Sequence, residues 1–391
     1  MKATFSAKFS WSREAQAGSL QQTGLGETVN VQRDAPYPEL KKTHTMAHVG
    51  RPWTDFKPPP AAPVWAAIEG LGRYYILVAA LDLNIFDTLQ RTGPSTVEQL
   101  SEELSLPVLH LRALLDAVVA LELLEQVRNV YDLNDAAKRY LVSDGPATMA
   151  ALVPVAPGPH ENWSRLADTV RQGKPAYPIE DNPAAFYVPL VEGTFTTMHR
   201  CATRADLKIR YSAMPEPRVL ELGAGGAPWA IAILQQNSRG TALVNDLDEV
   251  LPVARVNAAH FGLTDRINFR PGDFHTVEIE NEGYDLAILG HICRTEGEDG
   301  AKHLIQRAFS ALVPGGRLIL SDYFCDRERK LNPHAVLMGA TMMASTIRGF
   351  TFTHEEFSDW LRDVGFEALR LIEPIGFQQC FVAVKPAIKG T

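Results

Sequence analysis

The spacing of apolar residues changes along the chain and divides it into parts of different architecture. From Val64 onward apolar side chains recur at helical spacing, and "STVEQLSEEL" places Ser95 three residues before Glu98, a capping-box spacing that predicts a helix start. Further along, "PVLHLRALLDAVVALELLEQV" predicts an amphipathic helix, and "YDLNDAAKRYLV" predicts a short strand and a last helix. Several short helices followed by a small hairpin is the order of elements in a winged-helix module.

After Arg218, short apolar runs alternate with helical segments. The runs "RVLELG", "TALVND", "INFRPGD", "YDLAILG" and "RLILSDYF" predict strands, and "WAIAILQQ", "VLPVARVNAAHFG" and "AKHLIQRAFSALV" predict helices between them. This alternation predicts an α/β fold with a Rossmann-like, doubly wound parallel sheet. The last two apolar runs, "ALRLIEPI" and "QQCFVAVKP", predict an antiparallel C-terminal hairpin at the edge of that sheet.

These patterns predict four consecutive parts. Ser, Thr, Gln, Gly and Pro are frequent in the first segment, which shows little apolar periodicity and ends in "KPPPAAP". It is therefore expected to be an extended or mobile arm. The predicted boundaries are 1–60 for this arm, 61–150 for the mainly helical winged-helix domain, 151–212 for a helical connector and 213–391 for the sheet domain.

Charge and composition exclude several classes of function. The net charge of −8 disfavours a nucleic-acid binder, which needs a basic footprint to displace counterions. The segment "SLPVLHLRALLDAVVALELL", where a DNA-reading helix would lie, has Arg112 as its only Arg or Lys, so packing or dimerisation is the better prediction. No apolar run approaches the roughly 20 residues that cross a bilayer, so no membrane span is expected. The four cysteines form no CxxC pair, which predicts no metal site and no disulfide framework and favours the cytoplasm.

A glycine turn follows the first predicted strand of the sheet domain. In "VLELGAGGAPW" the turn contains Gly223 and Gly225, and Glu221 ends the strand before it. A dinucleotide-binding fingerprint would have a third glycine where this chain has Ala227. A carboxylate beside the turn would also repel a pyrophosphate. The turn therefore suits a cofactor with a cationic amino-acid end and no phosphate.

Two further carboxylates follow the next two predicted strands. Asp246, with Leu247 beside it, lies about twenty residues beyond the glycines, where an acid can accept both ribose hydroxyls of a nucleoside; alternatively Asp246 or Asp248 caps the following helix. In "FRPGDF", Asp273 can accept an adenine amino group while Phe274 covers the ring. Three acids at three successive strand ends predict S-adenosyl-L-methionine, or S-adenosyl-L-homocysteine as its product form, rather than a dinucleotide.

Together these motifs resemble a known family. "VLELGAGG", "NDLDEVL", "GDF" and "LVPGGRLILSDYF" look like class I S-adenosylmethionine-dependent methyltransferases. "ALDLNIFDTL", "LRALLDAVVALELLEQ" and "YDLNDAAKRYLV" resemble the winged-helix dimerisation domain of the small-molecule O-methyltransferases, which include the plant caffeate and acetylserotonin enzymes. The C-terminal part is similar to bacterial members, including the bacteriochlorophyllide C-methyltransferase. The resemblance covers about residues 64–387 and implies a homodimer whose interlocked N-terminal helices help to roof the partner's pocket.

The resemblance fails at the catalytic position. The plant-type enzymes have a Leu-His-Asp sequence whose His takes the proton from the substrate, and this chain has Cys293, Arg294 and Thr295 there. Arginine cannot act as that base, because its pKa exceeds about 12. Three accounts stay open: His291 supplies the base from one helical turn earlier, or proximity drives transfer while Arg294 binds a carboxylate, enolate or carbonyl. In the third account no methyl leaves, and Arg294 polarises a carbonyl in a pericyclase, cyclase or hydroxylase that retains its cofactor.

Further residues are candidates for contact with the substrate. Phe195 and Met198 in "GTFTTMHR" match a helix that in the family covers the methyl donor. The other candidates are His160, His334, Met338 and Met342, and the methionines suit a broad apolar pocket for flat aromatic or polyketide-like molecules. We therefore expect a methyltransferase that acts on oxygen or carbon of a small aromatic, polyketide-like or pigment molecule. The alternatives are the cofactor-retaining enzyme and a winged-helix regulator that senses the nucleoside.

Overall fold

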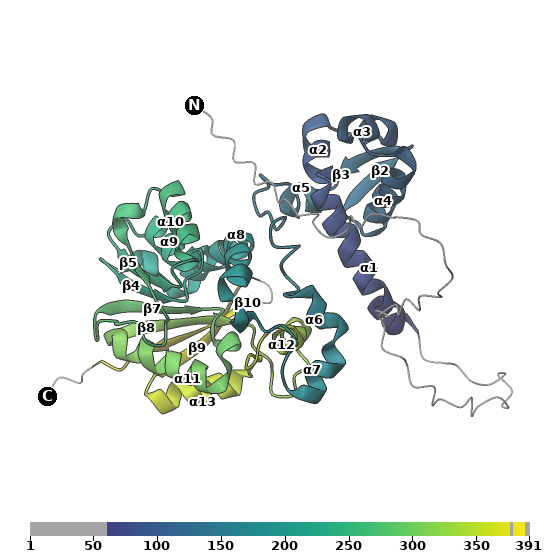
Figure 1. The fold of residues 1–391 in the computed structure, drawn as a ribbon. Helices are drawn as coiled ribbons and strands as arrows, with labels where there is room; N and C mark the ends of the chain where they lie inside the picture. Colours follow the sequence, from purple (N-terminus) through teal and green to yellow (C-terminus); the bar gives the residue numbers. More distant parts are fainter. Residues whose placement is uncertain (1–60, 376–377, 388–391) are drawn as a thin grey trace, which may run out of the picture. The chain divides into compact units, whose positions relative to one another are not determined.

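Two kinds of architecture are present in the described chain. The computed structural model describes residues 61–375 and 378–387, so the predicted arm at 1–60 lies outside the described residues. A mainly helical region with a three-stranded sheet comes first, and a seven-stranded sheet flanked by helices follows (Figure 1). The predicted α/β class, with a mainly helical N-terminal region, is confirmed.

The N-terminal region packs helices against a short antiparallel sheet. Its elements are α1 (Ala62–Asp82), α2 (Ile85–Thr92), β1 (Ser95–Thr96), α3 (Val97–Leu104), α4 (Val108–Ala120), β2 (Leu124–Val127), β3 (Val130–Leu133) and α5 (Asp135–Tyr140). The strand order is β1-β3-β2. Arg128 and Asn129 both have positive φ and form the two-residue turn between β2 and β3, a turn type whose twist matches that of antiparallel strands. Phe86, Leu115 and Tyr131 are fully buried in the core of this region.

The helix start predicted at Ser95 lies one residue later. Ser95 pairs with Tyr131 in the β1–β3 ladder, and its hydroxyl donates to the carbonyl of Gly93 at 2.9 Å. The strand pairing therefore takes Ser95 away from the helix end. Thr96 is the N-cap of α3 instead: its hydroxyl accepts the backbone N–H of Gln99, whose side-chain oxygen accepts the backbone N–H of Thr96.

Helix α1 differs from what the apolar pattern led us to expect. Among the described residues it is one helix that is long and apolar enough, by length and composition, to cross a membrane, so the expectation that no run approaches this length was wrong. Its apolar side chains are largely uncovered: Trp65, Ile68 and Leu71 are 59%, 61% and 69% exposed. An exposed apolar stripe of this kind is typical of a surface that another protein covers.

The seven-stranded sheet carries the rest of the fold. Its strands are β4 (Arg218–Leu222), β5 (Thr241–Asp246), β6 (Ile267–Pro271), β7 (Tyr284–Gly290), β8 (Leu312–Asp322), β9 (Glu367–Ile375) and β10 (Gln378–Val384), in the order β6-β5-β4-β7-β8-β10-β9. The first five in this order are parallel. β10 is antiparallel to both β8 and β9, so the predicted C-terminal hairpin is present.

Helices cover both faces of this sheet. Those that pack against it are α8 (Pro183–Ile209), α9 (Pro228–Gln236), α10 (Leu251–His260), α11 (Cys293–Ala311) and α13 (His354–Val364), whereas α6 (His160–Ser164), α7 (Leu166–Gln172) and α12 (Pro333–Ser345) pack against one another. Neighbouring residues of a strand point to opposite faces, so Val219 packs in the core with α9 and α10 and Leu220 packs in the core with α11 and α13. Figure 1 shows these two pairs of helices on opposite sides of the sheet.

The strand order reverses between β4 and β7. The chain runs from β4 outward through β5 to β6, and then returns to place β7 on the other side of β4. In an open α/β sheet, ligands bind outside the carboxyl ends of the strands at such a reversal, because the two connections diverge and leave a crevice. The glycine turn after β4 and the His291–Arg294 segment after β7 both lie at this point.

A glycine kink separates the first turn of α11 from the rest of the helix. Gly297 has φ 70° and ψ −174°, a combination that is essentially restricted to glycine. A Cβ atom there would lie 2.9 Å from the carbonyl oxygen of Arg348. The turn that carries Arg294 is thus a separate unit, and the N–H of Phe350 donates to the Arg294 carbonyl at 2.8 Å.

We predict that Gly297→Ala lowers the free energy of unfolding by roughly 1–3 kcal/mol from backbone strain alone, with a further loss from the close approach to Arg348. Chemical denaturation of the purified protein measures this. Gly262→Ala is the matched control, since Gly262 also has positive φ (67°) but a Cβ atom there meets nothing within 4 Å. Equal losses in the two variants would show that the contact with Arg348 is unimportant.

Candidate active site

The turn after β4 has no room for side chains. Gly223 and Gly225 have φ values of 59° and 55°. A Cβ atom on Gly223 would lie 1.9 Å from Cδ1 of Ile292, which follows β7, and one on Gly225 would lie 2.8 Å from Cγ1 of Val191 in α8. The two glycines thus allow three segments to approach one another. Glycine is the residue that can adopt this backbone conformation without a side chain that would block the approach.

Helix α8 packs against the glycine turn after β4. A Cβ atom on Gly226 would lie 3.2 Å from the ring of Phe195, one turn of α8 beyond Val191. Phe195 stacks on Phe261 with ring centroids 6.0 Å apart. The segment that contains Phe195 therefore packs against the glycine turn.

Glu221 is buried behind the turn. Its side chain is 2% exposed, and its Oε2 accepts the backbone N–H of Ala230 at 2.7 Å in the first turn of α9. Burial raises the pKa of Glu221 to about 8, although hydrogen bonds from the backbone of Ala230 and Trp229 act in the opposite direction. A cation at the turn would favour the ionised form of this carboxyl group.

Asp246 connects the end of β5 to the glycine turn. Its Oδ2 accepts the N–H of Gly225 at 2.6 Å, and its Oδ1 accepts the N–H of Leu247 at 2.7 Å. The helix that follows starts at Leu251 without a side-chain cap, so neither Asp246 nor Asp248 caps it. Burial raises the pKa of Asp246, against the lowering effect of these two backbone hydrogen bonds. The structure thus brings together Asp246 and the glycines.

The turn after β6 lies next to Asp246. Gly272 donates its N–H to the carbonyl of Asp246 at 3.0 Å, and the amide of Asn245 donates to the carbonyl of Gly272 at 2.8 Å. Asp273 follows on the surface, with Oδ1 accepting the N–H of His275, and Phe274 is half-buried. Asn245 is a positioning residue that sequence analysis missed, because an Asn inside a strand carries no motif.

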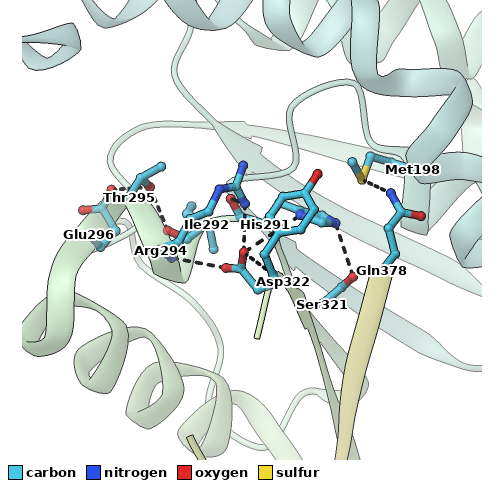
Figure 2. Close-up of polar contacts among 10 residues, drawn as sticks. Met198, His291, Ile292, Arg294, Thr295, Glu296, Ser321, Asp322 and Gln378 are labelled. Carbon is cyan, nitrogen blue, oxygen red and sulfur yellow. Dashed lines mark hydrogen bonds and ion pairs between the residues drawn. The ribbon is translucent and has the colours of Figure 1, made fainter. Parts of the chain in front are cut away.

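The turn after β7 places a guanidinium group where the base was sought (Figure 2). Nη1 of Arg294 donates to the carbonyl of His291 at 2.7 Å and to Oδ1 of Asp322 at 3.0 Å, and the backbone N–H of Arg294 donates to Oδ2 of Asp322 at 3.2 Å. Burial acts to lower the pKa of Arg294, but the charges of Asp322 and Tyr323 raise it overall. Arg294 is therefore a fixed cation.

Asp322 was not a predicted site residue, although it ends the quoted strand "RLILSD". It is 1% exposed and pairs with Arg294, whose guanidinium carbon also lies 5.1 Å from the ring centroid of Tyr323. The signal that could have found Asp322 is its place at a strand end of the same sheet edge. The sequence does not reveal that Asp322 pairs with an arginine from the turn after the neighbouring strand β7.

His291 lies in the same turn with its ring buried. Its φ is 62°, its Nε2 is 3.4 Å from the hydroxyl of Ser321, and its Nδ1 is 4.0 Å from Oδ1 of Asp322. Nδ1 has no hydrogen-bond partner among the described residues. Burial, followed by the charge of Arg294, lowers the pKa of His291 to about 4. The imidazole is thus neutral near pH 7 and weakly basic.

A tyrosine from α8 completes this side of the site. Burial, followed by the charge of Glu296, raises the pKa of Tyr187 to about 12, whereas Thr295 and Arg294 act to lower it. Glu296 in turn accepts from Nε2 of His275 at 3.0 Å. Neither aromatic residue of "NPAAFYVPL" belongs to a motif, so the sequence did not indicate that Tyr187 lies near Arg294 and Glu296.

The predicted substrate residues are distributed differently. Met198 is at the site, where its sulfur accepts the side-chain amide of Gln378 at 3.6 Å (Figure 2). The ring of His334 is 5.3 Å from that of Tyr323, and Met338 packs against the small cluster that includes Tyr323. Met342 is buried in α12. His160 instead contacts the hydroxyls of Tyr74 at 3.3 Å and Tyr75 at 3.1 Å.

Comparisons with known proteins identify the family of the chain. A model of the O-methyltransferase dimerisation domain matches residues 65–143, and a model of the O-methyltransferase domain matches residues 163–367, more than half of the chain. The 3-hydroxy-5-methyl-1-naphthoate 3-O-methyltransferase of Streptomyces sahachiroi is 27% identical over 318 residues, which is 78% of this chain and 88% of that protein. The tetracenomycin polyketide synthesis 8-O-methyl transferase TcmO of Streptomyces glaucescens is 27% identical over 322 residues, 79% of this chain and 92% of that one.

The fold is also similar to that of a solved methyltransferase structure. Human N-acetylserotonin methyltransferase in complex with S-adenosylmethionine superposes with a TM-score of 0.74 at 21% identity, covering 85% of this chain and 99% of the human chain. The chain therefore belongs to the O-methyltransferase family and is an S-adenosylmethionine-dependent methyltransferase.

Proposed function

We propose that this enzyme methylates a small aromatic or polyketide-like molecule, and that transfer depends mainly on alignment of the two reactants. The observation that carries the proposal is the close approach of the two turns at the strand-order reversal. Ile292, between His291 and Arg294, fills the space left by Gly223. A donor held by the glycine turn and an acceptor beside Arg294 would therefore be neighbours. Curated relatives with naphthoate and tetracenomycin in their names support the class of acceptor.

Several residues would hold S-adenosylmethionine, which when bound supplies a methyl group on a sulfonium centre. Gly223 and Gly225 would leave room for its amino-acid end, near the buried Glu221. The carboxylate of Asp246, which accepts the N–H groups of Gly225 and Leu247, would also accept hydrogen bonds from the ribose hydroxyls. Leu247 would lie beside the adenosine. Asp273 and Phe274, on the adjoining turn, would accept the adenine amino group and cover its ring.

The residues around the acceptor support positioning more than strong base catalysis. Positioning alone can lower a barrier by roughly 7–11 kcal/mol, provided the reacting atoms are aligned. His291 and Arg294 contact Ser321 and Asp322, and Met198 is held by the side-chain amide of Gln378. The orientation of the acceptor would then come from these side chains.

We also propose a homodimer formed through the N-terminal region, whose arrangement of helices and hairpin would be that of a winged helix. The dimerisation-domain match includes most of α1, the helix with the exposed apolar stripe. A second copy of the chain, and not a membrane, would cover Trp65, Ile68 and Leu71. The four described cysteines are free and buried, which supports the cytoplasm as the compartment.

Transfer of an isotopically labelled methyl group tests the proposed reaction. We expect purified protein to move the label from S-adenosylmethionine to an aromatic hydroxy compound, with one S-adenosylhomocysteine formed for each product, as mass spectrometry can measure. If an acceptor is converted while the label stays on the donor, the enzyme is a cofactor-retaining catalyst instead.

Replacement of Asp246 by Ala should weaken binding of S-adenosylhomocysteine by about 1–3 kcal/mol, because the ribose hydroxyls would lose a charged partner. Isothermal titration calorimetry measures the change. Asp248→Ala is the control, since that exposed residue is two positions away and should bind normally. An unchanged dissociation constant in Asp246→Ala removes this residue from the cofactor site.

Leu71→Glu should convert the homodimer into a monomer, since it places a charge in the apolar stripe of α1. Light scattering coupled to size exclusion distinguishes a 43.1 kDa monomer from a dimer of twice that mass. Val256→Glu in α10, where the side chain is 69% exposed, should remain dimeric. A wild-type monomer, or a dimer in both variants, contradicts the proposed interface.

A further inference from the structure

Arg294 has a hydrogen-bonding capacity that the described residues do not use. All its side-chain hydrogen bonds among the described residues are made through Nη1, to the His291 carbonyl and to Asp322. Its Nε–H is buried and has no acceptor in the part of the chain that the structure describes. A buried donor without an acceptor is unfavourable, so an oxygen atom that reached Nε would gain a charge-assisted hydrogen bond.

The groups around Arg294 keep its charge fixed and its surroundings dry. Asp322 and Tyr323 contact it from the end of β8, Tyr187 faces it from α8, and His291 and Glu296 lie on its own turn. The side chain of Arg294 is only 13% exposed. An anion that replaced water here would interact with the guanidinium in a medium of low dielectric, where charge pairs are stronger than in water.

The same turn offers no base for an ordinary phenol. Burial lowers the pKa of His291 to about 4, with Arg294 adding to the effect. Such a base would take the proton from a phenol of pKa about 10 in roughly one molecule in a million. An acceptor that arrives ionised needs no such step.

We propose, on the basis of the methyl transfer proposed above, that the acceptor is an aromatic oxyanion: an acidic phenol or enol that binds with its ionised oxygen on the Nε side of Arg294. Arg294 is then a catalytic residue that binds the nucleophile, not a substitute for a base. A lone pair of the oxyanion forms the new O–CH3 bond while the C–S bond of the sulfonium breaks. The negative and positive charges cancel, neutral ether and neutral sulfide result, and no proton has to leave.

A pair of acceptors with similar rings and different acidities tests the proposal. 2-Hydroxy-1,4-naphthoquinone is a strongly acidic enol that is ionised at neutral pH, whereas 2-naphthol is a neutral phenol there. Binding to the full-length dimer is measured by calorimetry or absorbance with S-adenosylhomocysteine present. We expect the naphthoquinone to bind more tightly than 2-naphthol, and its affinity to fall only as pH drops through the ligand's own pKa.

Arg294→Gln removes the charge of the side chain and replaces the guanidinium with a shorter, uncharged amide. It should weaken binding of the naphthoquinone roughly ten- to a hundredfold, as loss of a charge-assisted hydrogen bond does, and change the binding of 2-naphthol less than about twofold. S-adenosylhomocysteine should bind normally, which shows that the variant is folded. Arg327→Gln, at an arginine whose side chain is 78% exposed, is the control and should behave as the wild type.

Equal loss of both ligands in Arg294→Gln, equal affinity of the wild type for both, or no binding of either would overturn the inference. Two outcomes distinguish the failure of this inference from the failure of the proposed function. Labelled methyl transfer to 2-naphthol as readily as to the naphthoquinone retains the methyltransferase and rejects the oxyanion. Binding of the oxyanion that depends on Arg294, with no label transferred, supports the oxyanion site and rejects methyl transfer to it.

Discussion

The structure depends on one close approach, that of the turn after β4 to the turn after β7. The strand order reverses between these strands, and Gly223 leaves the space that Ile292 fills. A side chain at Gly223 would separate the two turns. Because they touch, a donor held by the glycine turn, as proposed, would lie beside an acceptor held by Arg294.

Charge is arranged around this contact with little access to water. Arg294 and Asp322 form a buried pair, and burial of such a pair is costly unless the remaining polar atoms find partners. The pair uses the backbone as well, since the carbonyl of His291 and the N–H of Arg294 both take part. We therefore interpret the Arg294–Asp322 pair as a contact that orients the guanidinium group, not as a source of stability.

The second half of the site is held by backbone contacts between loops. Asp246 binds Gly225 and Leu247, and Asn245 binds the turn that follows β6. These contacts connect three successive strand ends, so the geometry of the proposed adenosine side is coupled to the glycine turn. On the acceptor side the kink at Gly297 lets a single helical turn lie at its own angle, independent of the long part of α11.

The sequence by itself determined the class of fold, the parallel sheet with its antiparallel hairpin, the glycine turn and the acids that follow three successive strands. These features depend on local patterns, namely the helical spacing of apolar residues and the short continuous apolar runs of strands buried on both faces, which neighbouring residues reveal. It also showed that Arg294 replaces the expected histidine. The predicted start of α3 was wrong by one residue, because Ser95 pairs with a strand that is distant in the chain and Thr96 caps the helix instead.

Only the tertiary structure decided which groups meet. The pairing of Arg294 with Asp322 joins residues 28 positions apart, and Tyr187 reaches the same turn from another helix. The low basicity of His291 likewise comes first from burial, and the charge of Arg294, three residues further along the chain, adds to it. A linear pattern records which side chains are available at a sheet edge. Their contacts and their desolvation are set by segments distant in the chain, and these decide the chemistry.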